Sequence, residues 1–163
     1  MHRFHLSLGS NVEPEKHLRA ALRELRARFG ELQVSSVYES AAVGFDGPPF
    51  WNLAAGLQTD LDPAALNDWL HALEMREGRV RGGPRYADRT LDIDIIAVDG
   101  RTLERPELRE AFVLAPLGEI APEISEPVSG EKIGHLWMQS PRSHGVLRKL
   151  EIKLDSGFRR NDA

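Results

Sequence analysis

The chain has 163 residues, 41% hydrophobic and 28% charged, so it can bury a core and is not disordered along its length. It contains no cysteine, which excludes disulfide frameworks, cysteine-ligated zinc and thiol nucleophiles. The formal net charge of −4 argues against a nucleic-acid protein held by bulk positive charge. The start MHRFHLSLGSN lacks the apolar stretch of a signal peptide, and no run approaches a membrane span, so we expect a cytoplasmic protein.

Strand and helix patterns alternate over the first third of the chain. Apolar and polar residues alternate over residues 4–8, which predicts a first strand. Pro14 suits a first helical turn, and leucines at helical spacing predict a helix that ends at Gly30. Residues 32–38 and 52–59 are typical of two further strands.

The next segments complete the order strand, helix, strand, strand, helix, strand. The pair Asp62-Pro63 is typical of a helix start, and this second amphipathic helix ends at Gly78. Residues 91–98 predict a fourth strand, followed by the hairpin turn signal Asp99-Gly100. This is the split pattern of ferredoxin-like domains, so we predict an α+β fold: an antiparallel sheet with both helices packed on one face.

The remainder of the chain differs in character. We expect residues 101–125 to extend the domain with a short helical piece and the apolar run 112–117. From about Gln139 onward the periodicity is weak and basic residues are frequent. We therefore predict one domain over residues 1–138 and a C-terminal tail over 139–163, partly disordered.

Two carboxylates stand out on the fourth strand. Asp92 and Asp94 are two residues apart, so both project from one face of the strand, whereas Ile93 points the other way. On spacing alone, an ordinary solvent face explains them well. The alternative is a magnesium site, because Mg²⁺ typically takes one or two carboxylates and leaves its other positions to phosphates and water.

The segment before this strand favours the magnesium site. Its four arginines are Arg79, Arg81, Arg85 and Arg89. Charge runs are usually solvated surface, but such runs mix signs, and this one contains only Asp88 as an anion. Guanidinium groups match phosphate oxygens, and the glycines at 82 and 83 leave room for a ligand. We therefore predict binding of a magnesium-complexed nucleoside triphosphate, without a P-loop or a kinase glycine-rich loop.

The run GRVRGGPRYADRTLDIDII, with LSLGSN and FVLAPLGEIAPEI, closely resembles the 6-hydroxymethyl-7,8-dihydropterin pyrophosphokinases of folate biosynthesis. The resemblance covers about residues 3–125 and implies a ferredoxin-like α+β fold. It also implies transfer of pyrophosphate from ATP to the hydroxymethyl group of the pterin, with release of AMP. The implied partners are ATP and a reduced pterin, with neither nucleic acid nor membrane, and we expect a monomer.

The resemblance assigns residues to the nucleotide site. Asp92 and Asp94 match two aspartates that hold two Mg²⁺ ions between ATP and pterin. The matching arginines that contact the triphosphate are Arg79, Arg81 and Arg89. Arg85 and Tyr86 lie where the family has a mobile Arg-Trp pair, so we expect segment 82–88 to close over bound ligands. Glu74 matches a glutamate at the nucleotide site, and Ile95 a residue beside the adenine. Arg79, Arg85 and Arg89 are the expected catalytic residues.

The resemblance also assigns a pterin pocket. The residues that match its polar and backbone contacts are Gly9, Ser40, Ala41, Ala42, Val43 and Asn52. Phe50 and Phe112 match the aromatic pair that sandwiches the ring, although without the family core packing is the preferred explanation of these two residues. A flat heteroaromatic ring requires such π-faces for affinity and an amide to read its hydrogen-bonding edge.

This sequence departs from the family pattern at several positions. Ala41 and Ala42 replace two prolines, and Tyr86 replaces a tryptophan. The family's Pro-His pair and later arginine correspond here to LERPELREAF, with Arg105 near the histidine position and Glu110 at the arginine position. Either Arg105 or Arg109 substitutes, or nucleotide affinity is weakened.

Two other functions are compatible with these departures. One is a pyrophosphokinase or nucleotide hydrolase with another acceptor, and the other is a non-catalytic paralogue that binds pterin or nucleotide. Both aspartates and all four arginines are present, which argues against lost catalysis. No side chain stands out as a general base, although His5 and His71 are candidates.

Overall fold

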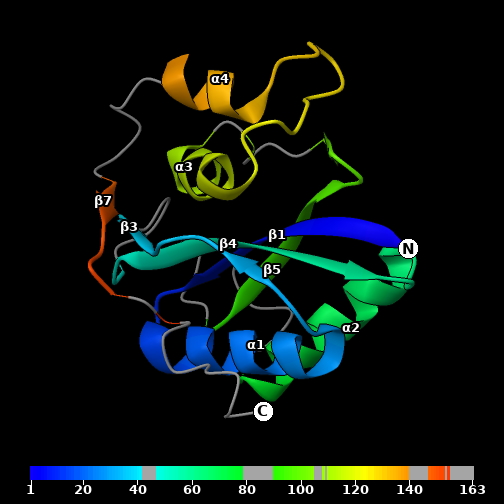
Figure 1. Cartoon of the computed structure of the whole chain (residues 1–163). Coiled ribbons are helices and arrows are strands. Elements are labelled where there is room, and N and C mark those ends of the chain that lie inside the picture. The colour runs from blue at the N-terminus through cyan, green and yellow to red at the C-terminus, as the bar shows by residue number, and fades with distance from the viewer. Residues whose placement is uncertain are drawn as a thin grey trace.

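The computed structural model describes residues 1–41, 47–78, 90–104, 108, 110–139, 147–152 and 154. The elements in chain order are β1 (His2–Ser10), α1 (Pro14–Phe29), β2 (Gln33–Val34), β3 (Tyr38–Ser40), β4 (Phe50–Thr59), α2 (Pro63–Arg76), β5 (Asp92–Val98), β6 (Arg101–Thr102), α3 (Ala111–Ile120), α4 (Ile133–Gln139) and β7 (Arg148–Lys149). One antiparallel sheet has α1 and α2 on one face and α3 on the other, with α4 stacked on α3 (Figure 1).

The strand order confirms the predicted ferredoxin-like arrangement. The sheet runs β6-β5-β1-β4-β3-β7, and β2 pairs with β4 beside β3. Every pair of named strands is antiparallel. The two long central strands, β1 and β4, are therefore flanked by β5 on one side and by β3 on the other.

The single strand predicted over residues 32–38 is instead two short strands. Ser35 lies between them and is bound to β4: its backbone N–H donates to the Ala54 carbonyl at 2.9 Å, and its Oγ accepts from the Ala54 N–H at 2.8 Å. The serine hydroxyl thus takes the place of a backbone acceptor. This local interruption of the ladder separates β2 from β3.

Leucines form the core between the sheet and the helices α1 and α2, as their helical spacing predicted. The fully buried members are Leu18, Leu22 and Leu25 of α1 and Leu66, Leu70 and Leu73 of α2. They form one cluster with the apolar face of β1, β4 and β5, which we call the first core. Asp62 caps α2 by accepting a hydrogen bond from the Ala65 N–H at 2.8 Å, as expected.

A second core lies on the opposite face of the sheet, beneath α3. Its members include Ala54 of β4, Ile96 of β5, and Val113, Leu114 and Leu117 of α3. Among the described residues, no helix combines the length and the apolar character that crossing a bilayer requires.

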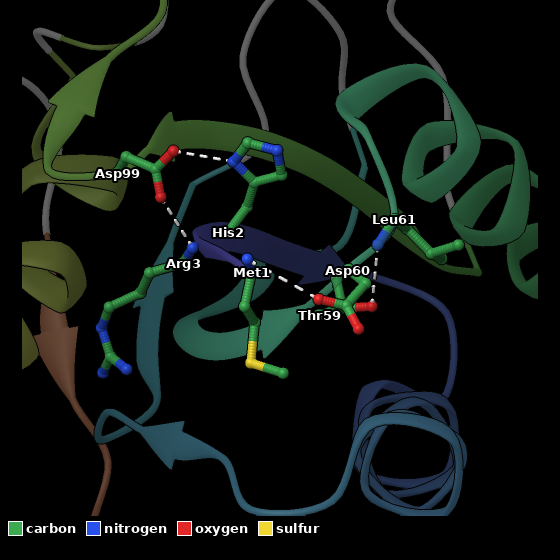
Figure 2. Close-up of polar contacts among 7 residues, drawn as sticks. All are labelled: Met1, His2, Arg3, Thr59, Asp60, Leu61 and Asp99. Atoms are coloured by element: carbon green, nitrogen blue, oxygen red, sulfur yellow. Dashed lines mark hydrogen bonds and ion pairs between the residues drawn. The ribbon is translucent and has the colours of Figure 1, made fainter.

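Polar contacts at one end of the sheet hold the start of β1 (Figure 2). His2 Nδ1 lies 2.8 Å from Asp99 Oδ2, and the Arg3 N–H donates to Asp99 Oδ1 at 2.9 Å. Asp99 belongs to the predicted hairpin turn, where Asp99 and Gly100 both have positive φ, 51° and 85°. The N-terminal amine lies 3.6 Å from Asp60 Oδ1. This end of β1 is therefore tied to the ends of both neighbouring strands.

Part of the C-terminal segment packs against the rest of the chain. β7 pairs with β3, and Leu154 is buried in the first core. Arg19 of α1 donates to the Leu154 carbonyl at 3.0 Å. The division into a domain over 1–138 and a tail over 139–163 stays a prediction, and most residues after 139 lie outside the described ranges.

Candidate functional site

Three residues on three neighbouring strands form a row across the sheet, which we call the central row. Gly9 of β1 is paired directly with Asp92 of β5 on one side and with Asn52 of β4 on the other. Directly paired residues of an antiparallel sheet project from the same face. Ala54 follows Asn52 by two residues and belongs to the second core, so the central row lies on the α3 face of the sheet.

Asp92 and Asp94 offer the oxygen donors that a magnesium ion prefers. Both side chains are half-buried, whereas Ile93 between them is 1% exposed in the first core. Ser7 is paired with Asp94 and adds a hydroxyl to the same face. Within the described ranges, no three metal-ligating side chains gather in one place. A metal here would have two carboxylates and open positions for phosphate oxygens and water, which suits Mg²⁺.

Glu74 of α2 holds the strand that carries the two aspartates. Its side chain is 1% exposed, and Oε2 accepts a hydrogen bond from the Ile93 N–H at 2.7 Å. This bond is made at the outer edge of β5, between Asp92 and Asp94. Ile95 is 3% exposed and lies in the first core, so its predicted contact with adenine stays a prediction.

Asn52 is held in place by hydrogen bonds that its amide nitrogen donates. The acceptors are Ser40 Oγ at 2.9 Å and the Tyr38 carbonyl oxygen at 3.2 Å. Asn52 is 4% exposed, and its Oδ1 faces Gly9: a Cβ added to Gly9 would lie 3.3 Å from that oxygen. The structure thus brings together three predicted pterin-site residues, Gly9, Ser40 and Asn52. Ala41 follows β3 and is exposed.

The two predicted aromatic residues come from different layers of the fold. Phe50 begins β4 on the same face as Asn52, and its Cδ1 would lie 3.7 Å from a Cβ on Gly9. Phe112 lies in the first turn of α3, half-buried at the border of the second core. Within the described ranges, Phe50 belongs to neither core cluster, whereas Phe112 packs against the second core. Packing in these two clusters therefore accounts for part of the burial of Phe112 and not for that of Phe50.

His5, one of the two candidate general bases, lies away from the central row. It lies four residues before Gly9 on β1, about 13 Å along the strand. It is 2% exposed, and neither ring nitrogen has a hydrogen-bond partner among the described residues. Desolvation by burial, together with the nearby Arg3 charge, lowers the pKa of His5 to about 4.

Several predicted residues lie outside the described ranges. They are Arg79, Arg81, Arg85, Tyr86 and Arg89 of the arginine segment, with its predicted closure; Ala42 and Val43 of the pterin loop; and Arg105 and Arg109. The residues that flank the arginine segment are described and lie side by side, since a Cβ on Gly78 would lie 3.8 Å from Thr90 Cγ2. Gly78 and Thr90, the residues on either side of the arginine segment, therefore lie together, and Thr90 is two residues before Asp92 along the chain.

Sequence reasoning did not single out Tyr38 or Glu119, which also lie beside this face. The Tyr38 hydroxyl donates to Glu119 Oε2 at 2.8 Å, and the Tyr38 carbonyl accepts from Asn52. Desolvation raises the pKa of Tyr38 above its ordinary value, and the hydrogen bond with Glu119 raises it further. Local periodicity carries no signal for this contact, because the two residues are 81 positions apart.

Comparison with known proteins places the chain in a family. Residues 5–122 match the family described as 7,8-dihydro-6-hydroxymethylpterin-pyrophosphokinase (HPPK). The match spans well over half of the chain, and the chain belongs to this family. The resemblance seen in the sequence is thereby confirmed.

Relatives and solved structures agree with this assignment. The chain is 39% identical over 138 residues to a 2-amino-4-hydroxy-6-hydroxymethyldihydropteridine pyrophosphokinase of Pseudomonas aeruginosa, covering 77% of this chain and 84% of that protein. It is 34% identical over 134 residues to the Bacillus subtilis protein of the same name, covering 75% and 80%. The wild-type HPPK-DHPS of Plasmodium falciparum superposes with a TM-score of 0.67 at 12% identity, over 85% of this chain and 44% of that one. This last likeness supports the fold alone.

Proposed function

We propose that this chain catalyses the pyrophosphokinase reaction for which its family is named. It transfers pyrophosphate from MgATP to 6-hydroxymethyl-7,8-dihydropterin and releases AMP, a step of folate biosynthesis. The observation that carries the proposal is the central row: Asp92, Gly9 and Asn52 place a carboxylate and an amide on one face of the sheet, with an open position between them.

The reaction breaks one bond to the β-phosphorus and forms another. The hydroxymethyl oxygen of the pterin attacks the β-phosphorus, and the bond from that phosphorus to the oxygen it shares with the α-phosphorus breaks. AMP leaves with the bridging oxygen, and the hydroxyl proton passes to water. Such a transfer needs in-line positioning and stabilisation of charge more than it needs covalent help from the protein.

Asp92 and Asp94 would hold the magnesium ions, of which we propose two. When bound, these ions neutralise phosphate charge and acidify the attacking hydroxyl. Glu74 keeps both carboxylates in place through its hydrogen bond to the Ile93 N–H. The arginines of segment 79–89 would supply further positive charge toward the triphosphate.

Asn52 and the two phenylalanines would orient the pterin. Ser40 and the Tyr38 carbonyl hold the Asn52 amide nitrogen in place. The Asn52 Oδ1 could therefore accept a hydrogen bond from the polar edge of the ring at little cost in side-chain entropy. Phe50 from the sheet and Phe112 from α3 offer π-faces to the flat ring. The hydroxymethyl group would then point past Gly9 toward Asp92.

One assay tests this function and separates it from its alternatives. The chain is incubated with ATP and Mg²⁺, with and without 6-hydroxymethyl-7,8-dihydropterin, and AMP is measured. We expect AMP only when both substrates are present. Release without the pterin would indicate a nucleotide hydrolase. Binding of both substrates by calorimetry without any AMP would indicate a non-catalytic paralogue.

A further inference from the structure

Glu119, in the last turn of α3, accepts three hydrogen bonds from the strand region beside the central row. Its Oε1 accepts from the Ser36 N–H at 3.0 Å and from the Ser36 hydroxyl at 2.8 Å, and its Oε2 accepts from the Tyr38 hydroxyl at 2.8 Å. Glu119 is an exposed residue, and its carboxylate still reaches Ser36 and Tyr38. They connect α3 with the segment that contains β3.

The charges on this cluster favour strong hydrogen bonds. Desolvation opposes ionisation of Glu119, but the hydrogen bonds from Ser36 and Tyr38 outweigh it and hold its pKa below the ordinary value. The Tyr38 phenol is neutral at neutral pH, and desolvation raises its pKa further above the ordinary value. A neutral phenol therefore donates to an ionised carboxylate at neutral pH, and charge-assisted bonds are about twice as strong as neutral ones.

Tyr38 is bound at two points that belong to different layers of the fold. Its hydroxyl is bound to Glu119 on α3, and its carbonyl oxygen accepts from the Asn52 amide nitrogen at 3.2 Å. Tyr38 is also paired directly with Asn52 in the sheet. One residue thus connects the amide of the proposed pterin pocket with the helix above it.

The same helix carries the aromatic residue of the pocket. Phe112 lies seven residues before Glu119, which is about two helical turns or 10 Å, so both project from the same side of α3. The contact of α3 with the sheet is otherwise made largely by the apolar side chains of the second core. Apolar contacts are not directional, and they define the position of a helix less sharply than hydrogen bonds do.

We propose that Glu119 and Tyr38 are a positioning pair that sets the distance between Phe112 on α3 and Asn52 on the sheet, and with it the width of the pterin pocket. Neither side chain needs to touch the substrate. The inference rests on the proposed function, because it assigns the pair to the pterin side of the reaction. It requires that breaking the pair affects the pterin much more than ATP.

Tyr38→Phe is the central variant for the test, because it removes the hydroxyl and keeps the ring and the backbone carbonyl. Glu119→Gln and the double variant complete a cycle. We expect each single variant to raise the KM for the pterin about 5-fold or more, with the KM for ATP changed less than about 2-fold. The double variant should be no worse than the more affected single variant, because the two residues act as a unit. Glu39→Gln is the matched control, a carboxylate on the same strand bound to Trp51 and Arg148 instead.

Pterin affinity measured by calorimetry well below the melting temperature separates positioning from folding. A merely structural role would lower the melting temperature and leave both affinities unchanged, which would overturn the inference. Equal losses for pterin and ATP, or additive losses in the double variant, would overturn it as well. If the wild-type chain binds the pterin but releases no AMP, the proposed activity fails, while an effect of Tyr38→Phe confined to pterin affinity would still support the positioning pair.

Discussion

Gly9 faces Asn52 across β1 and β4 so closely that a single methyl group on Gly9 would lie 3.3 Å from the Asn52 Oδ1. That distance is tighter than ordinary van der Waals contact, and the same methyl group would meet Phe50 Cδ1 at 3.7 Å. The absence of a side chain at position 9 therefore keeps the middle of the central row open between the carboxylate and the amide.

Gly9→Ala should rotate the Asn52 amide and narrow the space beside Phe50. We expect a rise in the KM for the pterin of about 10-fold, on the scale of one disturbed hydrogen bond in a desolvated site. Steady-state kinetics with each substrate varied in turn measures the effect. Gly118→Ala is the control, since its added methyl would meet Trp137 at an ordinary 3.7 Å. Unchanged kinetics in Gly9→Ala would mean that the pterin does not occupy this space.

Asp92→Asn and Asp94→Asn should each reduce turnover at least about 100-fold, because each removes a charged metal ligand. The fold should persist, since both side chains are only half-buried and the amide has the same shape as the carboxylate. AMP release over a range of Mg²⁺ concentrations, together with thermal melting, separates the two effects. Asp99→Asn, an exposed carboxylate in the β5–β6 turn, should leave AMP release near the wild-type rate. Near-normal turnover in either site variant would contradict the magnesium site.

Asn52→Ala should weaken pterin binding by about 1–3 kcal/mol and leave ATP binding nearly unchanged, because it removes a hydrogen-bonding group from a desolvated edge. The variant also releases Ser40 Oγ and the Tyr38 carbonyl from their bonds to the amide, so a modest loss of stability should accompany it. Calorimetry with each ligand distinguishes these effects. Equal losses for both ligands would mean that Asn52 acts on the fold alone.

His5 should make the protein less stable in mild acid. Its folded-state pKa of about 4 lies below the ordinary 6.5, so between these values the unfolded chain binds a proton that the folded chain does not. The stabilisation is complete above pH 6.5 and is lost as the pH falls toward 4, by up to about 3 kcal/mol. Chemical denaturation at several pH values measures this dependence.

His5→Leu should flatten this part of the stability profile, because the buried side chain no longer titrates. His135→Leu is the control, because it replaces a histidine at an exposed position on α4. If His5→Leu and the wild-type chain lose stability equally between pH 6.5 and 4, the acid sensitivity has another source.

The local pattern of the sequence predicted the main elements and the shared face of the two aspartates. Period-2 alternation identified β1 and β5 and required Asp92 and Asp94 to share a face, because successive side chains of any strand alternate. Helical periodicity and capping act over only a few residues. The sequence therefore also predicted the leucine stripes of α1 and α2 and the cap at Asp62. The motifs around these residues also resemble one family, to which the chain belongs.

Only the tertiary structure decided how distant segments meet. The register that places Gly9 between Asp92 and Asn52 depends on how three strands fit two cores, and no local pattern in any one strand specifies it. The same holds for Ser35, whose hydroxyl interrupts the strand predicted over residues 32–38, and for Leu154, which returns to the first core. Tyr38 and Glu119 are 81 residues apart, and their contact exists because side-chain packing brings α3 over β3. Periodicity reports which face a residue occupies, whereas long-range packing determines which residue it faces.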